Sequence, residues 1–150
     1  YMSPERKIMN VSFDFDNTLT MTQWCDEEGW FFKDAGPNLV MVQCAHAHIA
    51  MGNEVHIITS RMESTKSKTD ILRLLSNNGL GTKVTGIHFT NGSLKADKIV
   101  ELDISRHFDD DPDELAALPS HCDGVLINNT FLDAAGRVCD PLEPRFFAQP

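Results

Sequence analysis

The stretch Val-Ser-Phe-Asp-Phe-Asp-Asn-Thr-Leu-Thr (residues 11–20) decides the fold of this chain. Apolar residues lead up to Asp14, a second carboxylate follows at Asp16, and Thr18 comes two residues later. The pattern predicts a buried strand that opens into a loop and brings two carboxylates into one small volume. Two carboxylates about 4 Å apart repel each other by roughly 4 kcal/mol at an effective dielectric constant of about 20. A proton or a cation must therefore compensate the pair, and hard divalent cations prefer oxygen ligands.

Outside this stretch, apolar runs alternate with helical patterns, which indicates a parallel sheet with crossover helices. The predicted strands are residues 8–15, 54–59, 84–89, 105–109 and 124–128. The predicted helices are residues 38–51, 64–78, 95–102 and 112–118, the last with a proline in its first turn. We therefore expect an α/β fold, a single Rossmann-like three-layer domain over residues 1–150 with a five-stranded parallel sheet and no cap domain.

Ligands in such sheets bind beyond the carboxyl ends of the strands, where the strand order reverses, and Asp14 lies at such an end. Residues 20–36 are the only long insert near it and contain Trp24, Trp30, Phe31 and Phe32. We expect a loop folded onto the sheet by its own aromatic rings, or a flap over the site whose rings touch substrate. The stretch 130–150 has weak periodicity and receives no assignment.

Composition narrows the class of protein. The chain has 150 residues and a formal net charge of −9, which argues against binding along a nucleic-acid backbone but not against recognition of one phosphorylated end. No apolar run approaches the length of a membrane span, and no secretory signal is evident. Four cysteines without metal-ligand spacing suggest reduced thiols, so a cytoplasmic location is expected. The oligomeric state does not follow from the sequence.

A second motif is Val-His-Ile-Ile-Thr-Ser-Arg (residues 55–61). The predicted strand ends in Thr59 and Ser60, whose hydroxyl and backbone N–H groups can hold a phosphoryl oxygen. Arg61 can add a charge-assisted contact to an anionic substrate. Many strands end in Thr-Ser, so this motif indicates a phosphate site only in combination with the other motifs.

A third motif is Asn-Gly-Ser-Leu-Lys-Ala-Asp-Lys-Ile (residues 91–99), which places Lys95 at the start of a helix. A lysine there opposes the helix dipole, which suggests a role other than local stability. Lys98 lies one turn further on and is the alternative candidate amine. The alternative without any function is that both lysines are exposed to solvent.

A fourth motif, His-Phe-Asp-Asp-Asp-Pro-Asp-Glu (residues 107–114), runs from a short apolar segment into three consecutive aspartates. Alone it is compatible with a solvated acidic loop. Beside a strand that carries Asp14 and Asp16, it would complete the carboxylate side of a cation site. Mg²⁺ needs only one or two protein carboxylates together with waters and a substrate phosphate.

In order along the chain, the Asp-x-Asp-x-Thr of residues 14–18, Thr59, Lys95 and the Asp109–Asp110 pair resemble the motifs of haloacid dehalogenase-like phosphohydrolases. The resemblance covers Val11 to about Leu118 and implies a Mg²⁺-dependent phosphatase that forms an aspartyl phosphate. The short spacing between the lysine and the aspartate pair predicts a compact helix and strand between them.

The resemblance also implies roles for single residues. Asp14 would attack phosphorus, and Asp16 would protonate the leaving oxygen and then activate water. Thr59 would bind a phosphoryl oxygen, and Lys95 would offset charge on the nucleophile and the phosphoryl group. Contacts to substrate are expected from three more residues: Thr18, Ser60 and Arg61.

The metal ligands implied by the resemblance are Asp14, the backbone carbonyl of Asp16, and Asp110. Asp109 would be a supporting ligand or a group behind the metal, and Asp111 would face solvent. The expected cofactor is Mg²⁺.

Several substrates and one non-enzymatic role stay open at this stage. An open site without a cap resembles family members that act on large substrates, including polynucleotide 3′-phosphatases, and the Thr-Ser-Arg of residues 59–61 is similar to the pattern in that group. A phosphatase for nucleotides or sugar phosphates is the alternative, with a neighbouring subunit closing the site. A non-catalytic phosphoacceptor switch of the response-regulator type is disfavoured, because no aspartate ends the predicted strands 54–59 and 84–89.

Overall fold

The computed structural model describes residues 7–25, 31–127, 131–132 and 138–139. Five parallel strands form the central sheet in the order β5-β4-β1-β6-β7. Their bounds are β1 Asn10–Phe13, β4 Glu54–Thr59, β5 Gly86–Phe89, β6 Arg106–Asp109 and β7 Asp123–Leu126. The helices are α1 Leu39–Ala50, α2 Thr65–Asn77, α3 Ala96–Glu101 and α4 Pro112–Ala116. The expected α/β class with a five-stranded parallel sheet is confirmed.

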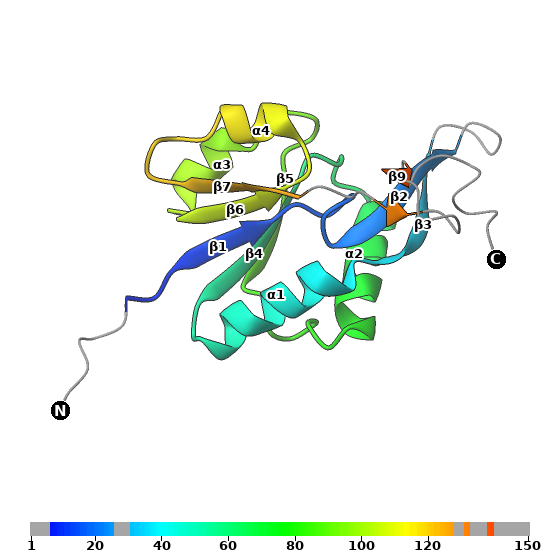
Figure 1. Cartoon of the computed structure of the whole chain (residues 1–150), viewed down its shortest axis with the longest axis horizontal. Coiled ribbons are helices and arrows are strands. Elements are labelled where there is room, and N and C mark those ends of the chain that lie inside the picture. The colour runs from blue at the N-terminus through cyan, green and yellow to red at the C-terminus, as the bar shows by residue number, and fades with distance from the viewer. Residues whose placement is uncertain (1–6, 26–30, 128–130, 133–137, 140–150) are drawn as a thin grey trace.

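The sheet lies between two helical layers, with α1 and α2 on one face and α3 and α4 on the other (Figure 1). Successive side chains of a strand point to opposite faces, so each face has its own core. On the α1–α2 face, the rings of Phe13 and Phe108 stack with their centroids 4.5 Å apart. On the other face, Ile58 packs with Ile99 and Ile104. Apolar burial on both faces is what the near-continuous apolar runs of these strands predict.

The helix boundaries follow from capping side chains. The side chain of Asn38 accepts a hydrogen bond from the Met41 amide, and that of Ser64 accepts one from the Ser67 amide. Asp111 caps α4 in the same way, ahead of the predicted first-turn proline. No helix in the described part of the chain is long and apolar enough to cross a membrane.

The first strand is shorter than predicted at both ends, and at its carboxyl end the chain turns after Asp14. Asp14 still donates its backbone N–H to the Phe108 carbonyl at 2.9 Å, but the carbonyl of Phe15 then accepts hydrogen bonds from three following amides. These belong to Thr18, Leu19 and Thr20. Asn17 has φ 60°, a left-handed conformation that asparagine tolerates better than most residues. The predicted strand 8–15 therefore ends in a tight turn.

The insert after this turn forms a β-hairpin. β2 (Thr20–Cys25) and β3 (Phe31–Pro37) pair antiparallel as a separate two-stranded sheet. The expectation of a loop over residues 20–36 was wrong, because these residues pair as two strands that do not share the apolar pattern of the main sheet. The alternative, a flap over the site, stays a prediction. Residues 26–30, which include Trp30, lie outside the described residues. So do the side chains of Trp24, Phe31 and Phe32, and the proposed contact of these rings with substrate stays a prediction.

Within the unassigned stretch 130–150, β8 (Phe131–Leu132) and β9 (Val138–Cys139) form a short antiparallel pair. The rest of that stretch lies outside the described residues.

Candidate active site

Three neighbouring strands end at one edge of the sheet and deliver the polar residues of the motifs there. Asp14 follows β1 in the centre, Thr59 ends β4 on one side, and Asp109 ends β6 on the other. The chain passes from β1 to β4 and β5 and then returns to place β6 against the free side of β1. This reversal of strand order leaves a crevice at the carboxyl ends of the strands.

A cavity of about 550 Å³ lies at this edge. Six carboxyl groups line it, together with two cationic side chains, a serine, a methionine and a proline. The acidic residues are Asp14, Asp16, Asp109, Asp110, Asp111 and Glu114, and the cations are Arg61 and Lys95. The motifs that lie far apart in the sequence are thus brought together around one open space.

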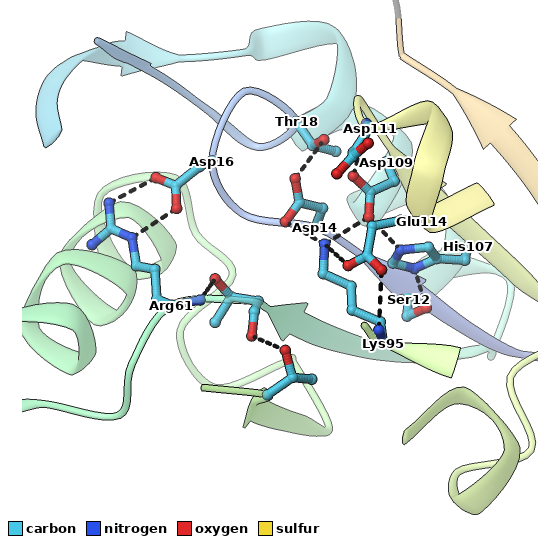
Figure 2. Close-up of polar contacts among 12 residues, drawn as sticks. Ser12, Asp14, Asp16, Thr18, Arg61, Lys95, His107, Asp109, Asp111 and Glu114 are labelled. Atoms are coloured by element: carbon cyan, nitrogen blue, oxygen red, sulfur yellow. Dashed lines mark hydrogen bonds and ion pairs between the residues drawn. The ribbon is translucent and has the colours of Figure 1, made fainter. Parts of the chain in front are cut away.

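Lys95 is the centre of the site (Figure 2). Its side chain extends from the start of α3 and is only 3% exposed, and its Nζ lies 2.9 Å from Asp14 Oδ1 and 2.6 Å from Asp109 Oδ2. Glu114 lies 3.4 Å from the same nitrogen and also accepts a hydrogen bond from the Lys95 backbone amide at 3.1 Å. Burial alone would lower the pKa of Lys95, but the charges of Asp14 and Asp109 raise it, so the ammonium is retained.

The alternative amine lies outside the site. Lys98 pairs with Glu101 at 2.8 Å, one turn away on the surface of α3. Of the two lysines left open by the sequence, only Lys95 reaches the carboxylates.

Asp109 is a buried, ionised carboxylate that protein groups already satisfy. His107 Nε2 lies 2.8 Å from Asp109 Oδ2, and the backbone amide of Asp111 donates to Oδ1 at 3.0 Å. Burial would raise the pKa of Asp109, but the His107 hydrogen bond and the Lys95 charge outweigh it and lower the pKa to about 2. His107 Nδ1 lies 2.7 Å from the Ser12 hydroxyl, so the two ring nitrogens of this side chain join Ser12 to Asp109.

The pKa values of Asp14 and Asp110 are raised, in contrast to that of Asp109. Burial holds the pKa of Asp14 well above its usual range, and the attraction of Lys95 offsets this only in part. Burial, with repulsion from Asp109, also raises the pKa of Asp110 to about 6. One lysine thus does not compensate all the carboxylates that surround it, and a further positive charge would stabilise the ionised forms.

Oxygen atoms of Asp14, Asp109 and Asp110 lie within 4.8 Å of one another. A set of carboxylate oxygens at this separation suits a hard divalent cation. A bound cation would stabilise the ionised forms of Asp14 and Asp110, whose pKa values are raised in its absence. The donor set therefore fits Mg²⁺.

Asp16 and Arg61 form a bidentate ion pair on the wall of the cavity, apart from the cluster around Lys95 (Figure 2). The two N–O distances are both 2.7 Å, and the guanidinium also donates to Asp70 at 3.0 Å. Its carbon lies 5.1 Å from the centre of the Phe15 ring. The predicted substrate contact of Arg61 would thus be shared with two carboxylates.

The hydroxyl residues of the motifs take different positions. Thr18 Oγ1 donates to Asp14 Oδ2 at 3.3 Å and so orients this carboxylate. Ser60 lines the cavity, whereas Thr59 is buried behind it and its hydroxyl accepts a hydrogen bond from the Arg61 amide at 3.2 Å. Asp111 is exposed and caps α4, in line with the expectation that it faces solvent.

Three residues of the site, His107, Ser12 and Glu114, had no role in the sequence interpretation. His107 precedes Asp109 by two positions on β6, and this period-two spacing could have indicated that both side chains lie on one face. Ser12 then meets His107 because these residues are register partners on β1 and β6. Glu114 gave no such signal, because its contact with Lys95 depends on how α4 packs beside α3.

Comparison with known proteins adds little to this picture. No protein-family model matches the chain, and the search of curated proteins gave no match. Among solved structures, a proposed 3-deoxy-D-manno-octulosonate 8-phosphate phosphatase from Vibrio cholerae is similar, with a TM-score of 0.47 and 15% identity. The match covers 75% of this chain and 63% of that one, so the chain spans less than two thirds of its length. Function is therefore inferred from the residues of this chain.

Proposed function

We propose that this protein is a Mg²⁺-dependent phosphomonoester hydrolase of the haloacid dehalogenase-like type that works through an aspartyl phosphate. The observation that carries the proposal is the contact of one buried lysine with Asp14 and Asp109 at the edge where β1 and β6 end. Asp110 and the cavity adjoin this contact. A nucleophilic carboxylate, a fixed ammonium and carboxylates that fit a divalent cation are groups that phosphoryl transfer through an aspartyl phosphate can use.

In the first step, a carboxylate oxygen of Asp14 forms a bond to phosphorus. The ester P–O bond breaks, its electron pair goes to the leaving oxygen, and the carboxyl group of Asp16 supplies the proton. In the second step, a water oxygen attacks phosphorus and gives its proton to the Asp16 carboxylate. The bond between phosphorus and Asp14 breaks, which releases inorganic phosphate and regenerates the nucleophile.

The surrounding residues orient and stabilise these groups. Thr18 fixes one oxygen of Asp14, and Lys95 offsets the negative charge that Asp14 and the phosphoryl group bring together. Asp16 is held by Arg61, so its proton transfer requires the side chain to turn from Arg61 toward the phosphoryl group. Ser60 lines the cavity and would contact a phosphoryl oxygen from the β4 side. The Thr59 hydroxyl lies behind the cavity and would have to turn from the Arg61 amide to do the same.

Asp14, Asp110 and the backbone carbonyl of Asp16 would hold Mg²⁺, with Asp109 behind them. Asp109 already accepts hydrogen bonds at both of its oxygens, which favours Asp110 as the direct ligand. Bound Mg²⁺ would neutralise negative charge on the transferring phosphoryl group.

Binding of Mg²⁺ is expected to raise the thermal unfolding midpoint above pH 6 and to raise it much less below pH 6. The reason is that Asp110, with a pKa of about 6, and Asp14 must lose their protons before they can ligate. Calorimetry with and without Mg²⁺ on both sides of pH 6 measures the difference.

The matched variants are Asp110→Asn and Asp111→Asn. Asp110→Asn should remove most of the Mg²⁺ effect, whereas Asp111→Asn should keep it, because asparagine still caps α4. An equal Mg²⁺ effect in the wild type and in Asp110→Asn would contradict the assignment.

The activity itself is tested by release of inorganic phosphate from a panel of phosphomonoesters with Mg²⁺ and with a chelator. We expect Mg²⁺-dependent release from at least one class of substrate. The panel includes 3′- and 5′-phosphorylated oligonucleotides, nucleoside monophosphates and sugar phosphates. Absence of release from all of them would instead favour a binding or phosphoacceptor role.

A further inference from the structure

Given the proposed function, the charge of the cavity wall limits which phosphomonoesters can bind. Among the residues that the structure describes, six carboxyl groups line the cavity against two cations. A bound divalent cation and the dianion of a phosphomonoester bring equal and opposite charges, so the excess negative charge of the wall remains. Field lines concentrate in such clefts, so a further anionic group would meet repulsion there.

Both cations of the lining that the structure describes already pair with carboxylates, and a turn of Asp16 toward the phosphoryl group would still leave Arg61 paired with Asp70. Lys95 contacts Asp14, Asp109 and Glu114 at 2.9, 2.6 and 3.4 Å. Arg61 spans Asp16 and Asp70 with contacts of 2.7 and 3.0 Å.

The nearest cations on α2 do not change this balance. Lys66 pairs with Asp70 at 2.8 Å and Lys68 pairs with Glu63 at 3.4 Å, and neither lysine lines the cavity. Within the described residues, the wall thus offers no basic track along which a phosphodiester backbone would bind.

The other described residues of the lining are neutral. Met62 is 64% exposed at the wall, and Pro112 and Ser60 also line the cavity. An apolar or hydroxylated group beyond the phosphate would meet these side chains without the cost of bringing like charges together.

We propose that this cavity selects phosphomonoesters whose leaving alcohol is uncharged and rejects those whose leaving group carries further negative charge. Neutral sugars, polyols and nucleosides belong to the accepted class. A 3′-phosphorylated oligonucleotide belongs to the rejected class, even though its reacting ester is the same as that of a nucleoside 3′-monophosphate.

Matched substrates separate charge from size. A nucleoside 3′-monophosphate is compared with the 3′,5′-bisphosphate, which adds one small, charged phosphate group. A 3′-phosphorylated oligonucleotide is compared with its counterpart that has uncharged methylphosphonate linkages. We expect each anionic partner to show a kcat/KM at least about tenfold lower, and the gap to shrink as salt is added, since salt screens exposed charges.

Two variants of α4 test whether the wall causes the discrimination. Asp111 lines the cavity, whereas Asp113 is exposed in the first turn of α4 and does not line it. Asp111→Asn should raise the ratio of kcat/KM for the bisphosphate over the monophosphate several-fold. Asp113→Asn removes the same charge nearby and should leave this ratio close to that of the wild type.

The outcomes distinguish this inference from the proposed function. Phosphate release with equal or greater kcat/KM for the anionic partners overturns the inference and leaves the phosphatase intact. Slow hydrolysis of both oligonucleotides with no penalty on the bisphosphate also overturns it, because size would then be the cause. No release from any ester overturns both.

Discussion

Replacement of Asp14 by asparagine is expected to abolish turnover while the fold survives. The amide cannot attack phosphorus, so kcat should fall by about 10⁴-fold or more, as for other nucleophiles that act within a catalytic unit. The fold should persist, because Lys95 keeps Asp109 and Glu114 as partners and loses only one of three carboxylates. Phosphate release and thermal unfolding, measured on the same preparation, give both results.

A suitable control for this experiment is Asp103→Asn. Asp103 is exposed, lies outside the cavity lining and has φ 54°, a conformation that asparagine accepts. This variant should match the wild type in both measurements. Turnover by Asp14→Asn within tenfold of that control would remove Asp14 from the role of nucleophile.

Replacement of Lys95 by methionine should have the largest effect on stability. It leaves three carboxylates without their shared cation in a buried position, a change that costs about 3–5 kcal/mol in comparable cases. For a chain of this length, the thermal midpoint should fall by roughly 10 °C. Activity should be lost as well, because the charge on Asp14 and the phosphoryl group is no longer offset.

The loss of stability in Lys95→Met should depend on pH. Without the ammonium, the pKa values of Asp14 and Asp109 in the folded state rise, so the folded state binds protons more readily. Stability lost by the variant should therefore be largest at neutral pH and should shrink as the pH falls and the carboxylates take up protons. Lys95 itself stays charged over that range, because its pKa is raised.

Lys98→Met is the control for Lys95→Met, since both residues lie in the same segment. Lys98 is half-buried and its partner Glu101 is exposed, so solvent screens the pair and this variant should unfold close to the wild type. Equal destabilisation by the two substitutions would show that the contacts of Lys95 with the buried carboxylates contribute no more to stability than the Lys98–Glu101 pair.

The layers of the fold could be predicted because buried strands and helices have recognisable patterns of apolar residues in the sequence. Strand β4 was predicted with its exact bounds, and α1 and α2 differ from prediction by one residue at each end. Their caps, Asn38 and Ser64, supply the signal for where the helices begin. The hairpin of β2 and β3 was missed, because its strands lie apart from the main sheet and do not share its apolar pattern.

The site was predicted less completely than the fold. The sequence placed Asp14, Lys95 and Asp109 at one edge because parallel strands end there together. It could not show that Arg61 pairs with Asp16, or that Glu114 completes the surroundings of Lys95. Both contacts depend on how a helix or loop is oriented beside the sheet, which no local pattern records.

The most direct test of the central claim is acid-quench mass spectrometry of the Asp16→Asn variant after reaction with p-nitrophenyl phosphate and Mg²⁺. The good leaving group needs little help from an acid, whereas attack of water on the intermediate loses its base, so the phosphorylated enzyme should accumulate. The proposed mechanism predicts release of p-nitrophenol together with the mass of one phosphoryl group on Asp14. Release of p-nitrophenol from a protein that carries no phosphoryl group, or carries it at another residue, would contradict it.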